Sequence, residues 1–207
     1  MSLLSDDKKK DRLILFDGHS IIYRSFYALP GFVTSDGFPT NAVYGYIRTV
    51  LKILRKWPSS RAALAMDSEA ETLRKEKFQD YKANRPEMPE DLSKQIPLIE
   101  EITDLLGINI LKKEKYEADD LIGTLTKLAG KKDIPVLIVS NDKDLMQLVR
   151  DGVKMIVPSS PSSISSLNWM TFCSELRSDS SCCFCERSRD ISVSISSISA
   201  ATSSGSS

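Results

Sequence analysis

The chain contains no long hydrophobic run. None of its 207 residues belongs to an apolar stretch that could span a bilayer. Residues 1–12 are polar and charged, without the hydrophobic core of a signal peptide. We therefore expect a soluble, cytoplasmic protein with no membrane partner.

Net charge is also absent. Lys and Arg total 28 and Asp and Glu total 28, so the formal charge is zero. This balance argues against a grossly basic surface for nucleic acid, although it does not describe how the charges are distributed.

Cysteine and histidine are almost missing. All four cysteines lie after residue 158, and His19 is the only histidine. The cysteine spacing does not match the common zinc-binding pairs, and no histidine accompanies them. A metal site in the first 158 residues would therefore use oxygen ligands, which select Mg²⁺ or Mn²⁺ over Zn²⁺.

Composition changes sharply after residue 158. Serine fills 20 of the 49 positions in residues 159–207. We divide the chain into a polar N-terminal extension (1–11), a folded catalytic domain (12–158) and a Ser/Cys-rich tail (159–207). The tail has no periodic apolar pattern, and we interpret it as disordered or as the product of a frameshift.

Short apolar runs alternate with amphipathic segments along the domain. The runs predict strands at 12–16, 62–66, 108–111, 134–139 and 153–157, and Asp17-Gly18 predicts a turn after the first of them. The amphipathic spacing predicts helices at 41–57 and 89–107, the second with Pro97 as a kink and Gly107 as a stop. This alternation predicts an α/β domain with a mainly parallel sheet.

Acidic residues follow three of the predicted strands within three positions. Asp17, Asp67 and Asp142 would emerge at one edge of a parallel sheet, where ligands bind in such folds. Three further acids begin a predicted helix at Tyr116: Glu117, Asp119 and Asp120. Acids in a first helical turn also complement the helix dipole, so the pattern of these three alone leaves both interpretations open.

A carboxylate cluster of this size suits phosphoryl chemistry. It can hold two divalent ions about 4 Å apart, which favours phosphodiester hydrolysis. A basic stretch at 74–85 would meet substrate phosphates, or would be an ordinary solvated face. Tyr23 and Arg24 could stack a base and hold a phosphate, or could simply pack.

Six motifs occur in series over residues 13–158. They are Phe16–Ser20, Tyr23–Ala28, Met66–Asp67, Tyr81–Arg85, Tyr116–Asp120 and Ser140–Asp144. In order and spacing they resemble the 5′-3′ exonuclease domain of bacterial DNA polymerase I, in the 5′-nuclease or flap-endonuclease superfamily. The resemblance implies a PIN-like or resolvase-like 5′-nuclease fold, with helices flanking the sheet and a helical arch.

The resemblance also implies roles for individual residues. Ligands around the first metal site would be Asp17, Asp67, Glu117, Asp119 and Asp120, and Asp142 and Asp144 would serve the second. Asp17, Asp67 and Lys82 would be catalytic, with Lys82 the electrostatic partner of the scissile phosphate. Tyr23, Arg24, Tyr81 and Arg85 would bind substrate, and His19 would be structural rather than a general base.

The implied function is metal-dependent removal of DNA 5′ ends, flaps and RNA primers in replication and repair, by a monomer. After residue 158 the family's further acids and duplex-gripping helix-hairpin-helix have no counterpart. One alternative is therefore a catalytically impaired fragment that only binds branched nucleic acid. A PIN-like ribonuclease is a second alternative, but it would not explain the motif at 81–85.

Overall fold

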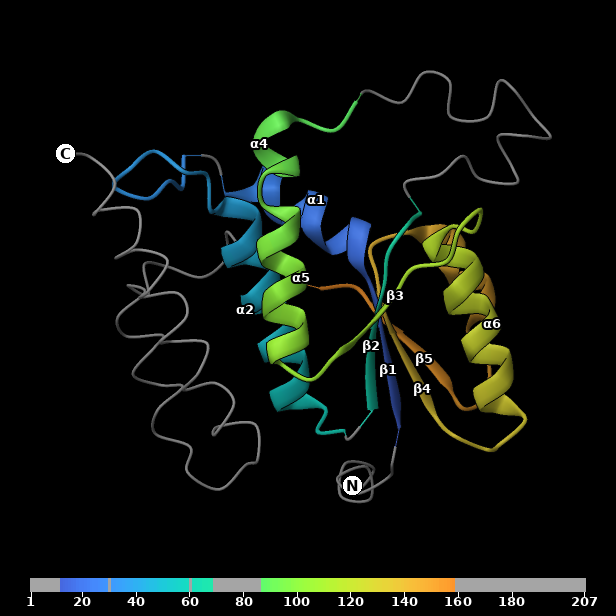
Figure 1. Ribbon diagram of the computed structural model, residues 1–207. Coiled ribbons are helices and arrows are strands. Elements are labelled where there is room, and N and C mark those ends of the chain that lie inside the picture. Colours follow the sequence, from blue (N-terminus) through green and yellow to red (C-terminus); the bar gives the residue numbers. More distant parts are fainter. Residues whose placement is uncertain (1–11, 30, 60, 69–86, 159–207) are drawn as a thin grey trace.

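Five parallel strands form one sheet at the centre of the molecule (Figure 1). The computed structural model describes residues 12–29, 31–59, 61–68 and 87–158. The strand order is β3-β2-β1-β4-β5, which confirms the predicted α/β fold with a parallel sheet. The strands are β1 (Leu13–Asp17), β2 (Arg61–Ala65), β3 (Asn109–Leu111), β4 (Val136–Val139) and β5 (Val153–Ile156).

Helices cover both faces of the sheet (Figure 1). One face packs against α1 (Gly18–Ala28), α2 (Asn41–Lys56), α4 (Glu90–Ser93) and α5 (Ile96–Leu105). The other face packs against α6 (Ala118–Gly130) and the 3₁₀ helix η1 (Lys143–Leu148). The central strand β1 serves both layers: Ile14 and Phe16 point to the α1 side and Leu15 to the α6 side.

The chain enters a helix directly after β1, where the sequence predicted a turn. Asp17 ends the strand and is the N-cap of α1, because its Oδ1 accepts a hydrogen bond from the Ser20 N–H at 3.2 Å. Gly18 suggested a turn, but a Cβ at this position would lie 2.8 Å from the Ala65 carbonyl oxygen. Glycine therefore permits a close approach to β2 here rather than a change of direction.

The predicted helix at 89–107 is two helices. The break lies at residues 94–95, before Pro97, which occupies the first turn of α5 where no intrahelical N–H is needed. The buried Gln95 Oε1 accepts hydrogen bonds from the Ala42 and Val43 N–H groups at 2.9 and 3.2 Å. Gln95 thus satisfies backbone donors at the start of α2. Gly107 has a φ of 69° and ends the second helix as predicted.

Other boundaries differ from the predictions by about two residues. The acidic helix begins at Ala118 rather than Tyr116, and β4 begins at Val136. The N-terminal extension, the arch motif at 81–85 and the tail at 159–207 lie outside the described residues. Within the described ranges, no helix is long and apolar enough to cross a membrane.

Candidate active site

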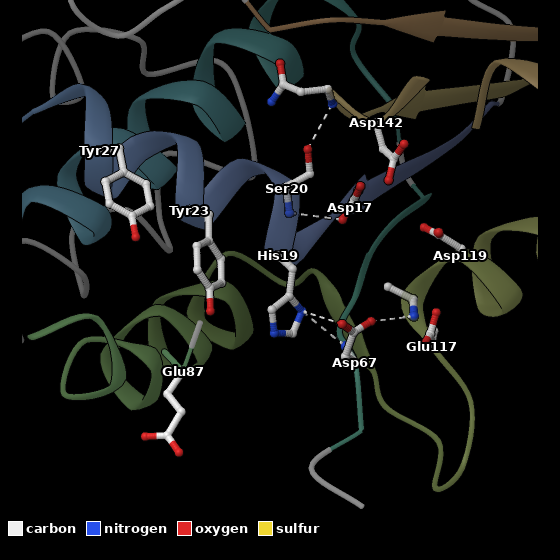
Figure 2. Close-up of a pocket in the computed structure, with 12 residues that line it drawn as sticks. Asp17, His19, Ser20, Tyr23, Tyr27, Asp67, Glu87, Glu117, Asp119 and Asp142 are labelled. Atoms are coloured by element: carbon white, nitrogen blue, oxygen red, sulfur yellow. Dashed lines mark hydrogen bonds and ion pairs between the residues drawn. The ribbon is translucent and has the colours of Figure 1, made fainter. Parts of the chain in front are cut away.

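The carboxyl ends of the strands and the start of α6 surround a pocket of about 430 Å³ (Figure 2). Five of the seven predicted metal ligands line it: Asp17, Asp67, Glu117, Asp119 and Asp142. They come from β1, the segment after β2, the start of α6 and the segment after β4. Convergence at this edge follows from the parallel topology, as predicted.

Asp17 is the most deeply placed of the pocket aspartates. It is 4% exposed, and its Oδ2 accepts a hydrogen bond from the Ser140 hydroxyl at 2.5 Å. Burial raises the pKa of Asp17, and the nearby Asp67 carboxylate adds to this effect. The hydrogen bonds from Ser140 and Ser20 act in the opposite direction because they stabilise the ionised form.

Asp67 joins β2 to both neighbouring helices. Its Oδ1 accepts a hydrogen bond from the Ala118 N–H at 2.8 Å, in the first turn of α6. Its own N–H donates to His19 Nδ1 at 3.3 Å, and Oδ2 lies 3.7 Å from the same nitrogen. His19 therefore contacts the residue that follows Met66 at the end of this segment, and its structural role stays a prediction.

The segment after β4 is tied to β1 and α1. Ser140 Oγ accepts a hydrogen bond from the Asp142 N–H at 2.9 Å, and Ser20 Oγ accepts one from the Asn141 N–H at 2.9 Å. Asp142 is the N-cap of η1 through a 2.9 Å hydrogen bond from the Asp144 N–H. Ser20, Ser140 and Asn141 lie within the motifs Phe16–Ser20 and Ser140–Asp144, but no role was predicted for them, because serine and asparagine are common in turns and loops.

Two predicted ligands face a neighbouring pocket. Asp120 and Asp144 line a second hollow together with Lys127 and Lys143, and Asp119 borders both pockets. Asp120 also forms a capping box with Glu117, accepting a hydrogen bond from the Glu117 N–H at 3.2 Å. The resemblance grouped Asp120 with the first set of ligands, whereas here it shares a pocket with Asp144.

A row of three rings leads along α1 from the acids (Figure 2). His19 and Tyr23 stack with ring centroids 6.2 Å apart, and Tyr23 lies 6.4 Å from Tyr27. All three line the pocket, so the predicted substrate residue Tyr23 is well placed. Tyr27, which the predictions missed, is 64% exposed and extends the row outward. Arg24 donates a hydrogen bond to Asn141 Oδ1 rather than lining the pocket.

The donor set around the pocket suits a hard divalent cation. Six carboxylates line it when Glu87 is included, and no Lys or Arg does so among the described residues. Within that part of the chain, no three Asp, Glu, His or Cys side chains already surround one point closely enough to hold an ion. The acids nevertheless fit such cations, because oxygen ligands predominate and the buried Asp17 carboxyl meets no Lys or Arg in the described part of the pocket lining.

Comparison with known proteins assigns the chain to a family. The family model described as "5′-3′ exonuclease, N-terminal resolvase-like domain" matches residues 12–173. The chain belongs to this 5′-3′ exonuclease family. The match begins at the predicted domain start and ends inside the segment interpreted as a tail.

Curated relatives agree with this family. A 5′-3′ exonuclease of Aquifex aeolicus is 44% identical over 146 residues, which cover 70% of this chain and 50% of that protein. The thermostable DNA polymerase I of Thermus thermophilus is 43% identical over 149 residues, or 72% of this chain and 18% of the polymerase. The chain thus spans half the length of the first relative and under a fifth of the second.

Solved structures share the fold. The bacteriophage T5 D15 protein co-crystallised with metal ions superimposes with a TM-score of 0.55 at 19% identity, covering 70% of this chain and 54% of that one. A pseudo-enzyme-product complex of the T5 D15 flap endonuclease with DNA and metal ions gives 0.54 at 20% identity, with the same coverages. The predicted 5′-nuclease fold is therefore confirmed.

Proposed function

We propose that this chain is a divalent-metal-dependent 5′-3′ exonuclease and flap endonuclease that hydrolyses phosphodiester bonds at DNA 5′ ends and flaps. The observation that carries the proposal is the convergence of five predicted acids on one pocket in a chain of the 5′-3′ exonuclease family. RNA primers are a second proposed substrate, and the protein is proposed to act as a monomer in the cytoplasm.

Electrostatics explain why a cation is needed. A phosphate entering this pocket meets six carboxylates and no Lys or Arg among the described residues. At 4 Å, each uncompensated pair of unit charges costs about 4 kcal/mol at an effective dielectric constant of 20. Cations between the carboxylates and the phosphate would turn this repulsion into attraction. Solved T5 structures of the same fold contain bound metal ions, zinc in one of them, which supports binding of divalent metal ions. The ions proposed for this chain are Mg²⁺ or Mn²⁺.

Different residues of the chain would bind the cations and hold the site in place. Asp17, Asp67, Glu117, Asp119 and Asp142 would hold cations in the first pocket, and Asp120 and Asp144 would extend the ligand set beside it. When bound, divalent cations in such sites activate water and stabilise the leaving oxygen. His19 accepts a hydrogen bond from the Asp67 N–H and would hold the segment after β2 against α1 rather than transfer a proton.

Substrate contacts would lie along α1 and in the arch motif. Tyr23 and Tyr27 present rings beside the acids and could stack the bases next to the scissile bond. Arg24 would hold a phosphate near the 5′ end once it leaves Asn141. Tyr81, Lys82 and Arg85 are proposed to grip the strand from the arch, with Lys82 facing the scissile phosphate.

Cleavage of a labelled 5′-flap DNA by the full chain tests the proposal. We expect cutting in Mg²⁺ and Mn²⁺, none in EDTA, and loss of activity in Asp67→Asn and Lys82→Ala. Matched controls are Asp104→Asn on the exposed face of α5 and Lys131→Ala at the end of α6, neither of which lines the pocket. Folded protein that binds the flap without cutting it would instead support the impaired fragment that only binds branched nucleic acid.

A further inference from the structure

Ser140 lies directly behind the pocket, between two of its acids. It follows β4 and is fully buried, so it does not line the pocket itself. Its hydroxyl donates to Asp17 Oδ2 at 2.5 Å and accepts from the Asp142 N–H at 2.9 Å. One side chain thus contacts a residue of β1 and a residue that begins η1.

The direction of both hydrogen bonds is fixed by chemistry. A peptide N–H can only donate, so the Asp142 N–H occupies one lone pair of the hydroxyl. An ionised carboxylate can only accept, so the single hydroxyl proton points to Asp17. Each bond polarises the hydroxyl in the sense that strengthens the other. Ser140 therefore cannot release one partner without weakening its hold on the second.

The bonds also restrict the Asp17 side chain. Its Oδ1 is held by the Ser20 N–H at 3.2 Å and its Oδ2 by Ser140, so neither oxygen can rotate freely. Each carboxylate oxygen still has a second lone pair for a cation. On the other side, the fixed Asp142 N–H sets the position from which the Asp142 carboxylate reaches the pocket.

We propose that Ser140 is a positioning residue: its hydroxyl fixes the Asp17 and Asp142 carboxylates relative to each other so that divalent cations bind between them. This inference rests on the proposed function. Hydrogen-bond partners of metal ligands typically change metal affinity or activity by about 10- to 100-fold when they are removed. Ser140 acts through both acids and does not touch the substrate.

Two variants of equal shape isolate the hydroxyl. Ser140→Thr keeps the hydroxyl and adds a methyl group, whereas Ser140→Val replaces that hydroxyl by a second methyl. Any strain from the added volume is common to both variants and cancels in the comparison. Mn²⁺ affinity of the full chain is measured by titration calorimetry without DNA, and kcat and KM are measured on the 5′-flap DNA.

We expect Ser140→Thr to bind Mn²⁺ close to wild type and Ser140→Val to bind at least tenfold more weakly. In Ser140→Val kcat should fall while KM for DNA changes little, because the DNA contacts lie elsewhere. If the added methyl prevents folding of both, Ser140→Ala adds no volume and should show the same loss. Its control is Ser25→Ala, which removes a buried serine hydroxyl that donates to the Ile21 carbonyl within α1.

The outcomes distinguish failure of the role proposed for Ser140 from failure of the proposed nuclease function. Equal Mn²⁺ affinity in the threonine and valine variants, or in Ser140→Ala and Ser25→Ala, would overturn the role of Ser140 while leaving the nuclease proposal intact. A lower melting temperature with unchanged affinity would likewise reduce Ser140 to a structural residue. A wild-type chain that binds no Mn²⁺ would overturn the proposed function, and this inference with it.

Discussion

Replacing Gly45 with alanine should destabilise the protein, although alanine is the better helix former. Gly45 lies in α2 where that helix crosses α1, and a Cβ there would sit 2.6 Å from Ser25 Cβ and 2.8 Å from Ser25 Oγ. Ordinary carbon–carbon contacts are about 3.5–4.0 Å, so the helices would have to separate by about 1 Å. Such overpacking typically costs about 1–3 kcal/mol.

Gly123 of α6 provides the matched control. A Cβ there meets nothing closer than Leu148 Cδ2 at 3.9 Å, which is an ordinary contact. Both substitutions gain roughly 1 kcal/mol of helix propensity, so this gain cancels when the two variants are compared. We expect Gly123→Ala to raise the free energy of unfolding by about 1 kcal/mol, and Gly45→Ala to be less stable than Gly123→Ala by about 1–3 kcal/mol.

Urea unfolding of the two variants, followed by circular dichroism, measures this difference. Adding Ser25→Gly to the Gly45→Ala background removes the two clashing atoms, and the double-mutant cycle should show a favourable coupling of about 1–3 kcal/mol. Equal stabilisation by both alanine substitutions would show that α1 and α2 are not in close contact, and would undermine the placement of the pocket residues on α1.

Three further predictions concern the core and the acids. Gln95→Leu should lower the free energy of unfolding by about 2–4 kcal/mol in urea titrations, because the N–H groups of Ala42 and Val43 lose a buried acceptor and Asn41 Oδ1 loses its donor; a loss no larger than that of a substitution on the exposed surface would contradict this account. In EDTA, the raised pKa of Asp17 contributes stability at acid pH that disappears as the pH rises through that pKa. Asp17→Asn should therefore gain stability relative to wild type as the pH rises, and a difference that is constant with pH would be evidence against the burial effect. Saturating Mn²⁺ at 100 times its Kd should stabilise the wild type by about 2.7 kcal/mol, seen as a higher melting temperature, and Asp67→Asn should gain clearly less; an equal gain would remove Asp67 from the ligand set.

The sheet and its acidic edge could be predicted because their signals are local and strong. Unbroken apolar runs predicted the strands, and the parallel topology then carried Asp17, Asp67 and Asp142 to one edge. The helix α1 was missed because Gly18 suggested a turn and Arg24 interrupted the apolar pattern. Gly18 packs against Ala65 of β2, and Arg24 donates a hydrogen bond to Asn141 after β4. Both contacts join residues that are distant in the sequence.

The sequence could predict only part of how the acids are divided between the two pockets. Adjacent helical residues point about 100° apart, so helix geometry predicts different surroundings for Asp119 and Asp120. Asp119 borders both pockets, whereas Asp120 lines the second pocket and not the first. Which pocket receives Asp120 depends on how α6 packs against the sheet and on the position of η1, which brings Asp144 beside it. Single-sequence patterns contain no information on that packing.

Several acids of the site are also the caps of helices. Asp17 caps α1, Asp142 caps η1 and Asp120 belongs to the capping box of α6. The partial positive charge of each helix start offsets some of the repulsion among these carboxylates before any cation arrives. An alanine substitution at one of these acids would therefore remove a helix cap worth about 1 kcal/mol together with a metal ligand. A loss of activity could then not be separated from a loss of stability. Asparagine preserves the cap while removing the charge, so asparagine variants give the cleaner measure of what each acid contributes to catalysis.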